Sequence, residues 1–200
     1  MMTVRMIERT YGARDFSRLL HDLTSHRADA LVRWDARASR HTLAAVMSAI
    51  RLDELNFAGH PLSGKMIQVV LSAQEADGGW GDPLTTALCL RALLGGRGDG
   101  VAVERGLAYL ANLQQEGGSF PAGPFRRMAA DGHATATVVY LLAEHPAAWA
   151  VVDLGGAADW LDANPDAQDV ATRVIARHAL TRCRRAPVPT QPTRPAAKVA

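Results

Sequence analysis

The stretch that decides the fold is QEADGGW at residues 74–80, because a second stretch of similar design, QQEGGSF, follows at residues 114–120. Each begins with glutamine, passes through glycine and ends in an aromatic ring, and the two lie 40 residues apart. Each also follows an apolar run, at 66–71 and at 107–113. An ordered pattern that returns at a period of this length indicates a chain built from repeated supersecondary units.

A second pattern repeats downstream of the first. Residues 82–87 and 131–136 both have the form Asp-x-x-x-Thr-Ala. A third, degraded copy is expected at 166–171, where an aspartate and an alanine keep the same spacing. Because the two patterns recur together, the repeated unit is predicted to be a pair of helices joined by a turn.

Helical periodicity accounts for most of the chain, and no alternating strand pattern competes with it. In each unit the outer helix is expected to be amphipathic and the inner helix apolar around most of its surface. The expected helices span residues 42–52, 62–74, 85–94, 101–115, 135–144, 157–164 and 170–180. The sequence therefore predicts an all-α protein of about four helix hairpins.

Three regions follow from this pattern. Residues 1–60 are expected to hold N-terminal helices that form either a degenerate repeat or a cap. Residues 61–182 hold the repeats. Residues 183–200 contain four prolines and several basic residues, and this composition is typical of a disordered tail.

Composition excludes several classes of protein. The formal net charge of +2 gives no electrostatic reason to expect nucleic acid as a partner, and the arginines at 173–185 are interpreted as a solvated helix end. The chain lacks an apolar run of the roughly 18 residues that a transmembrane helix needs. Two cysteines, Cys89 and Cys183, do not suggest a disulfide framework. We therefore expect a cytoplasmic protein without a transmembrane segment.

The pattern at 70–80 and 110–120 resembles the Gln-Trp repeat of squalene-hopene and related terpenoid cyclases. The Asp-x-x-x-Thr-Ala element and the helix after it are similar to the repeats of protein prenyltransferase β-subunits. The likeness covers 62–145 well and 156–181 weakly. It implies an α/α toroid around an apolar cavity. Because a closed ring of this kind uses about six hairpins, we expect a partial toroid. Its ends would be covered by the N-terminal helices, by a homodimer or by a partner subunit, or it would remain a curved partial ring with a groove.

The repeated residues also have a purely structural explanation. Trp80 and Phe120 would fill the gap between neighbouring hairpins at the turn. The glycines beside them permit positive φ angles. Gln74 and Gln114 would form hydrogen bonds with the unpaired backbone carbonyl or amide groups at adjoining helix ends. Asp82 and Asp131 would cap the inner helices that follow them.

The residues that carry cyclase or transferase chemistry are largely missing. No Asp-x-Asp-Asp proton donor and no Asp-Asp-x-x-Asp magnesium motif is present. The resemblance would place a zinc-binding histidine at His133, but the matching aspartate and cysteine are absent, since Cys89 lies a full turn further along. We therefore expect no cofactor and no metal site, with magnesium entering only if the substrate carries a diphosphate.

One acid–base pair remains as a catalytic candidate. Asp131 would donate a proton and His133 would tune its acidity. The alternative interpretation is an N-cap aspartate beside an exposed histidine. The candidate substrate-binding residues are three aromatic and two cationic side chains: Trp80, Phe120, Tyr140, Arg126 and Arg127.

Two functions therefore stay open on the sequence. The first is a terpenoid-cyclase-like protein that binds an isoprenoid or another apolar small molecule and can catalyse its cyclisation or transfer. The second is a non-catalytic helical-repeat scaffold that binds a peptide or a partner protein. The apolar inner helices favour the first, and the missing acid and metal motifs favour the second.

Overall fold

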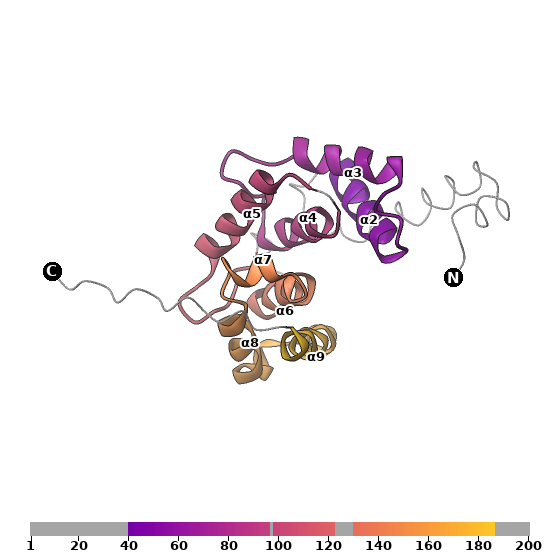
Figure 1. The fold of residues 1–200 in the computed structure, drawn as a ribbon. Coiled ribbons are helices and arrows are strands. Elements are labelled where there is room, and N and C mark those ends of the chain that lie inside the picture. The colour runs from indigo at the N-terminus through magenta and orange to yellow at the C-terminus, as the bar shows by residue number, and fades with distance from the viewer. Residues whose placement is uncertain (1–39, 97, 123–129, 187–200) are drawn as a thin grey trace.

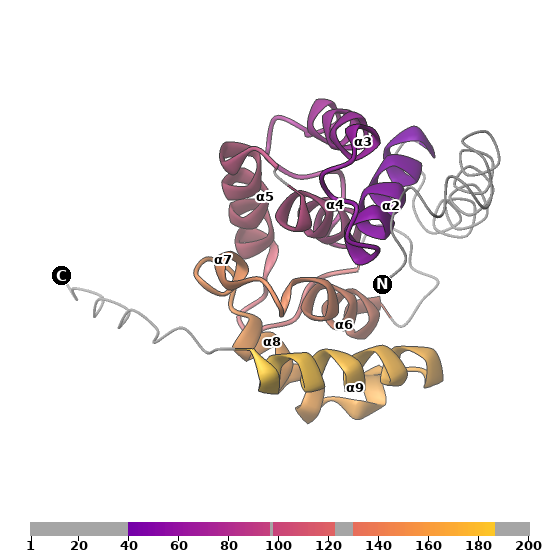
Figure 2. The same cartoon turned by 45° about the vertical axis from the view of Figure 1, so that its right-hand side comes forward.

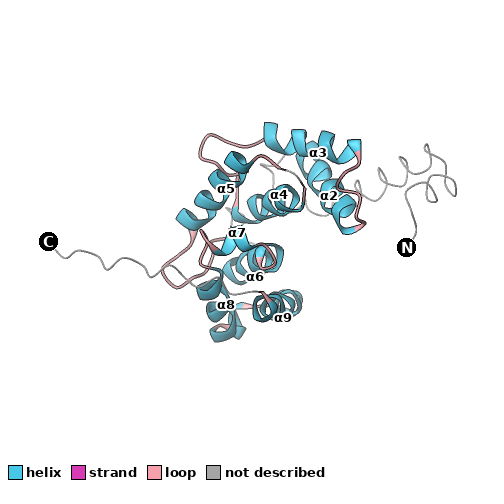
Figure 3. Cartoon of the chain, viewed as in Figure 1, coloured by secondary structure: helices cyan, strands magenta, loops and turns pink. Residues whose placement is uncertain are grey.

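The computed structural model describes residues 40–96, 98–122 and 130–186. Within these ranges every regular element is a helix, as Figure 3 shows. The helices are α2 (Arg40–Glu54), α3 (Pro61–Ser72), α4 (Pro83–Gly95), α5 (Gly100–Leu113), α6 (Ala130–Leu142), α7 (Pro146–Trp149), α8 (Leu154–Ala163), the 3-10 turn η1 (Pro165–Ala167) and α9 (Val170–Arg185). The all-α prediction is confirmed.

The predicted helices match the observed ones except at their ends. Helix α6 begins at Ala130, five residues before the predicted start. The short helix α7 was not predicted. Helix α9 continues to Arg185, so the expected boundary at 182/183 falls inside it. The expected cap within 1–39 and most of the expected tail lie outside the described residues. No described helix combines the length and the apolar character needed to cross a lipid bilayer.

The helices pack in two layers. Helices α2, α4, α6 and α9 contact one another in that order and form the inner layer. Helix α3 packs on α2 and α4, α5 packs on α4, and α8 packs on α6 and α9. Figures 1 and 2 show these two layers of helices. Within the described residues α2 and α9 share no extensive contact, so the inner layer is an arc rather than a closed ring.

The two glycine–aromatic turns have the same hydrogen bonds. The Gln74 side-chain amide donates to the carbonyl oxygens of Gly78 at 2.8 Å and Ala102 at 2.9 Å. The Gln114 amide donates to the carbonyl oxygens of Gly118 and Asp153, both at 2.8 Å. Ala102 belongs to α5, whereas Asp153 is the N-cap of α8. Each glutamine therefore ties its own turn to the outer helix of the next hairpin.

The glycines Gly78 and Gly118 occupy equivalent places in these turns, with φ angles of 94° and 91°. This region of backbone conformation strongly favours glycine. A Cβ atom on Gly78 would lie 2.7 Å from the carbonyl oxygen of Arg105 in α5, and one on Gly118 would collide with the Gly156 carbonyl oxygen in α8. Both glycines thus let a turn touch the backbone of the next outer helix.

The aromatic residue of each turn connects the two repeated patterns. Trp80 is 3% exposed and Phe120 is fully buried. The backbone N–H of Trp80 donates to the Thr86 hydroxyl at 3.0 Å, and that of Phe120 donates to the Thr135 hydroxyl at 2.9 Å. These threonines belong to the Asp-x-x-x-Thr-Ala elements. The patterns recur together because each threonine holds the aromatic turn against the start of the inner helix.

The third copy is not where the sequence pattern placed it. Asp166 lies in η1, because Pro165 begins a 3-10 turn there. Asp169 is instead the N-cap of α9, and its Oδ1 accepts from the Thr172 backbone N–H at 2.7 Å. Asp82 makes the same kind of bond at the start of α4. The third aspartate of the series is therefore Asp169, three residues after the predicted position.

Candidate functional site

The predicted acid–base residues lie at the start of α6 but have separate partners. Asp131 is the second residue of α6, and its Oδ1 accepts from the backbone N–H of Ala122 at 3.0 Å. The prediction that it precedes and caps the helix, as Asp82 does, is wrong, because α6 begins one residue earlier. Asp131 instead ties the preceding loop to the helix.

His133 lies in the interface between α6 and α9. Its side chain is 7% exposed, and Nδ1 lies 3.2 Å from the Thr172 hydroxyl of α9. The interpretation of His133 as an exposed histidine is therefore wrong. Burial lowers the pKa of His133, and the negative charge of Asp169 partly opposes this shift. Asp169 at the N-terminus of α9, rather than Asp131, is the carboxylate that acts on this imidazole.

Of the aromatic candidates, Phe120 lies beside Asp131: its backbone N–H donates to the Thr135 hydroxyl, which in turn donates to the Asp131 carbonyl oxygen at 2.6 Å. Trp80 and Phe120 belong to the core between the layers, and the Trp80 indole N–H donates to the Val70 carbonyl oxygen at 2.8 Å. Tyr140 lies on α6, nine residues after Asp131, which corresponds to roughly 13 Å along a helix. Arg126 and Arg127 lie outside the described residues. The three described members of the predicted binding set thus lie at different places: Trp80 in the first turn, Phe120 in the second turn beside Asp131, and Tyr140 near the C-terminal end of α6.

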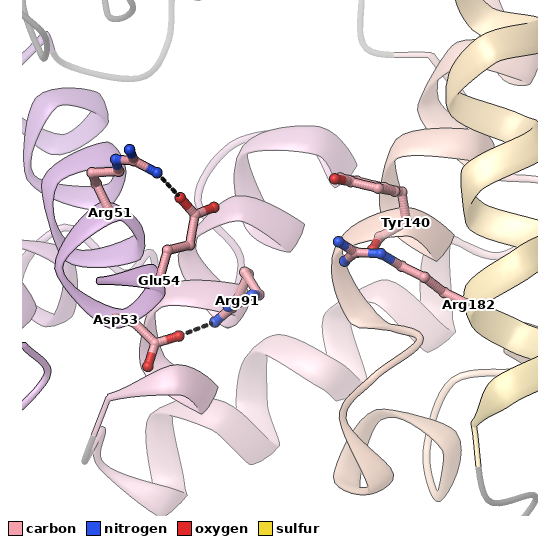
Figure 4. A network of polar contacts seen from close by, with 6 residues as sticks. All are labelled: Arg51, Asp53, Glu54, Arg91, Tyr140 and Arg182. Atoms are coloured by element: carbon pink, nitrogen blue, oxygen red, sulfur yellow. Dashed lines mark hydrogen bonds and ion pairs between the residues drawn. The ribbon is translucent and has the colours of Figure 1, made fainter. Parts of the chain in front are cut away.

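Polar side chains do gather at the C-terminal ends of the inner helices (Figure 4). Arg91 of α4 forms an ion pair with Asp53 of α2, with 2.9 Å between Nη1 and Oδ2. A Cβ atom on Gly95 would lie 2.5 Å from that same carboxylate oxygen, so the glycine leaves room for the pair.

The second half of this network joins α6 to α9. The Arg182 guanidinium lies over the Tyr140 ring, 3.9 Å from its centroid, and donates to the Tyr140 carbonyl oxygen at 2.9 Å. Its Nε lies 3.5 Å from Glu144 Oε1. Tyr140 is therefore placed by a cation–π contact with a neighbouring helix. Sequence reasoning missed this contact because the two residues are 42 positions apart.

His145 follows α6 and is the N-cap residue of α7. Burial and the positive charge of Arg91 lower its pKa, Glu144 and Asp53 oppose this, and Arg182 lowers it further. Its Nε2 is buried and has no hydrogen-bond partner among the described residues. The inner helices and the segment after α6 thus bring two cations, two carboxylates and one buried imidazole to the same end of the arc.

Both buried histidines are expected to make stability depend on pH. Their pKa values are lowered in the folded chain, so the unfolded chain takes up protons first as the pH falls below about 6.5. The free energy of unfolding should therefore decrease from pH 7.5 to pH 5.5, a window above the titration of most carboxylates. Urea unfolding at several pH values measures this slope.

Two variants separate the effect of the two buried histidines from that of an exposed histidine. A chain carrying His133→Gln and His145→Gln should show a flatter slope than the wild type, since those protons can no longer be taken up on unfolding. His178→Gln serves as the control, because His178 is exposed on α9. An unchanged slope in the double variant would contradict the assignment.

Residues 40–96, 98–122 and 130–186 bring together no group of three or more histidine, cysteine, aspartate or glutamate side chains that could hold a metal ion. Comparisons with protein-family models, curated proteins and solved structures gave no match. The resemblance to terpenoid cyclases and protein prenyltransferases therefore rests on the repeat residues alone.

Proposed function

We propose that this chain is a non-catalytic helical-repeat scaffold that binds a peptide or a partner protein on its open arc. The observation that carries the proposal is that the repeated residues make contacts within the fold. In each repeat the glutamine, the glycine, the aromatic ring and the threonine all contact another part of the chain. A residue held in this way stabilises the fold and is not free to act on a substrate.

The carboxylates of the repeats support the same proposal. Asp82 and Asp169 accept hydrogen bonds from backbone amides at the starts of α4 and α9. Such bonds favour the charged carboxylate, whereas a proton donor to an alkene must hold its proton until the reaction. Asp131 holds the loop before α6 through the Ala122 amide. These acids therefore suit a structural role.

The arc itself suits partner binding. Repeat arrays with two layers of helices present an extended surface and need caps at their ends, which a partner can supply. Here the inner layer of the described residues ends at α9, whose extensive contacts with other described helices are with α6 and α8. The competing proposal, binding of an isoprenoid with or without its cyclisation, is carried by the likeness of the repeats to terpenoid cyclases.

The experiment that tests the scaffold is affinity purification of the tagged full chain from its own cells after cross-linking. We expect one partner protein at a fixed ratio, and that partner should raise the melting temperature of the purified chain. Recovery of the chain alone would overturn the proposal. Farnesyl diphosphate, geranylgeranyl diphosphate and squalene form the second arm, the diphosphates with and without magnesium. Thermal stabilisation or cyclised products with these compounds would favour the isoprenoid function instead.

A further inference from the structure

Helix α9 carries an exposed stripe along its whole length. Its buried residues include Thr172, Ala176 and Ala179, which share one face of the helix. On the opposite face Val170 is 75% exposed and Val174 is 55% exposed. The stripe continues toward the C-terminus through three polar residues that are also exposed: Arg177, Thr181 and Arg184. Two valines in line with arginines make this face both apolar and basic.

The charge of this face is not balanced by its neighbours. Helix α9 contains five arginines and no acidic residue. Arg182 is held by Tyr140 and Glu144, but the other four, Arg173, Arg177, Arg184 and Arg185, are exposed and make no ion pair with another described residue. Two α9 stripes laid parallel on one another would bring like charges together.

The place of the stripe in the fold indicates the shape of its occupant. Along the inner layer α4 is covered by α2 and α6, and α6 is covered by α4 and α9. Helix α9 is the last of the series, and its exposed face points away from α6 and α8. A further helix laid on this face would continue the inner layer by one step. The occupant that the packing favours is therefore a helix.

We propose that the α9 stripe is a docking surface for an acidic amphipathic helix of a partner protein. This inference rests on the scaffold function proposed above. Apolar residues of the partner helix contact Val170 and Val174, while its carboxylates face the arginines of the C-terminal half. An extended polyanion fits less well, because two exposed aspartates, Asp166 and Asp169, lie within four residues of the start of α9 in the chain.

The direct test uses a synthetic helical peptide of about 20 residues, long enough to form a helix, with leucines on one face and glutamates beside them. A peptide of the same composition in scrambled order controls for charge alone. Binding is measured by fluorescence anisotropy at physiological salt. We expect the amphipathic peptide to bind roughly tenfold more tightly than the scrambled one.

Three variants of the full chain locate the surface. The double variant R177E/R184E and the single variant V174S should each weaken binding of the amphipathic peptide, the first by roughly tenfold or more. Lys65→Glu is the matched control, because it reverses an exposed charge on α3 and should leave binding unchanged. Equal binding of the two peptides, or equal binding by R177E/R184E and the wild type, would overturn the proposal.

Two further outcomes would also overturn it. These are tighter binding of the wild type to a short DNA duplex, or to phosphatidylserine vesicles, than to the peptide. The cross-linked purification separates this proposal from the scaffold function. A partner retained by R177E/R184E overturns the α9 surface and leaves the scaffold standing, whereas a wild type without any partner overturns the scaffold. Loss of the partner in R177E/R184E but not in Lys65→Glu supports both.

Discussion

Replacement of Phe120 by alanine is expected to lower the free energy of unfolding by about 4 kcal/mol. Phe120 is fully buried and packs in the core where the second turn meets the start of α6. Its removal loses the transfer free energy of the ring and leaves a cavity in the core. Because a domain of this size is stable by only about 5–15 kcal/mol, the loss is a large share of the total.

Urea unfolding followed by circular dichroism measures this loss for the folded variant. Phe57→Ala is the control, since Phe57 is only partly buried in the loop after α2 and should cost clearly less. Trp80→Phe adds a second comparison, because it keeps a ring but removes the indole N–H bond to the Val70 carbonyl oxygen, which still accepts from the Ala73 backbone N–H, at a cost of about 0.5–1.5 kcal/mol. A loss below about 1 kcal/mol for Phe120→Ala would mean that the ring does not hold the two hairpins together.

The second large effect is expected at Gly118. Gly118→Ala should destabilise the chain by about 2–4 kcal/mol, because alanine is strained at a φ of 91° and its Cβ would collide with the Gly156 carbonyl oxygen. The atoms that this Cβ would meet all belong to the backbone of Gly156 and Ala157, so no side chain can move aside to relieve the contact. The second turn would have to separate from α8, and urea unfolding measures the cost.

Gly117 offers a control one residue away. Its φ is not positive, and a Cβ atom there would approach the Trp160 ring no closer than 3.5 Å, an ordinary contact. Gly117→Ala should therefore change the free energy of unfolding by less than about 0.5 kcal/mol. If the two variants proved equally stable, close backbone approach at Gly118 would not explain the glycine.

The sequence predicted those parts of the fold that depend on local spacing. Apolar periodicity and glycine positions located the main helices, and the coupling of the two patterns in the first repeat reflects a short-range bond, that between Trp80 and Thr86. The third copy was misplaced because the choice between Asp166 and Asp169 as the cap depends on the 3-10 turn between them.

The candidate site was less predictable because its contacts are long-range. The ion pair between Asp53 and Arg91 joins residues 38 positions apart, and the contact between His133 and Thr172 joins residues 39 apart. No periodicity in one sequence shows which helices become neighbours. The burial of His133 could have been suspected from the apolar surface of α6, but its partner on α9 could not.

The hydrogen bonds of Gln74 and Gln114 have a further consequence for lengthening the repeat array. Beyond its own turn, each glutamine bonds to the start of the next outer helix, and each threonine hydroxyl accepts a hydrogen bond from the turn just before its own helix. One repeat therefore contains all the residues needed to join it to another copy of the same repeat. Splicing an extra 40-residue segment between Gln74 and Gln114 should lengthen the array by one hairpin without redesign of its neighbours.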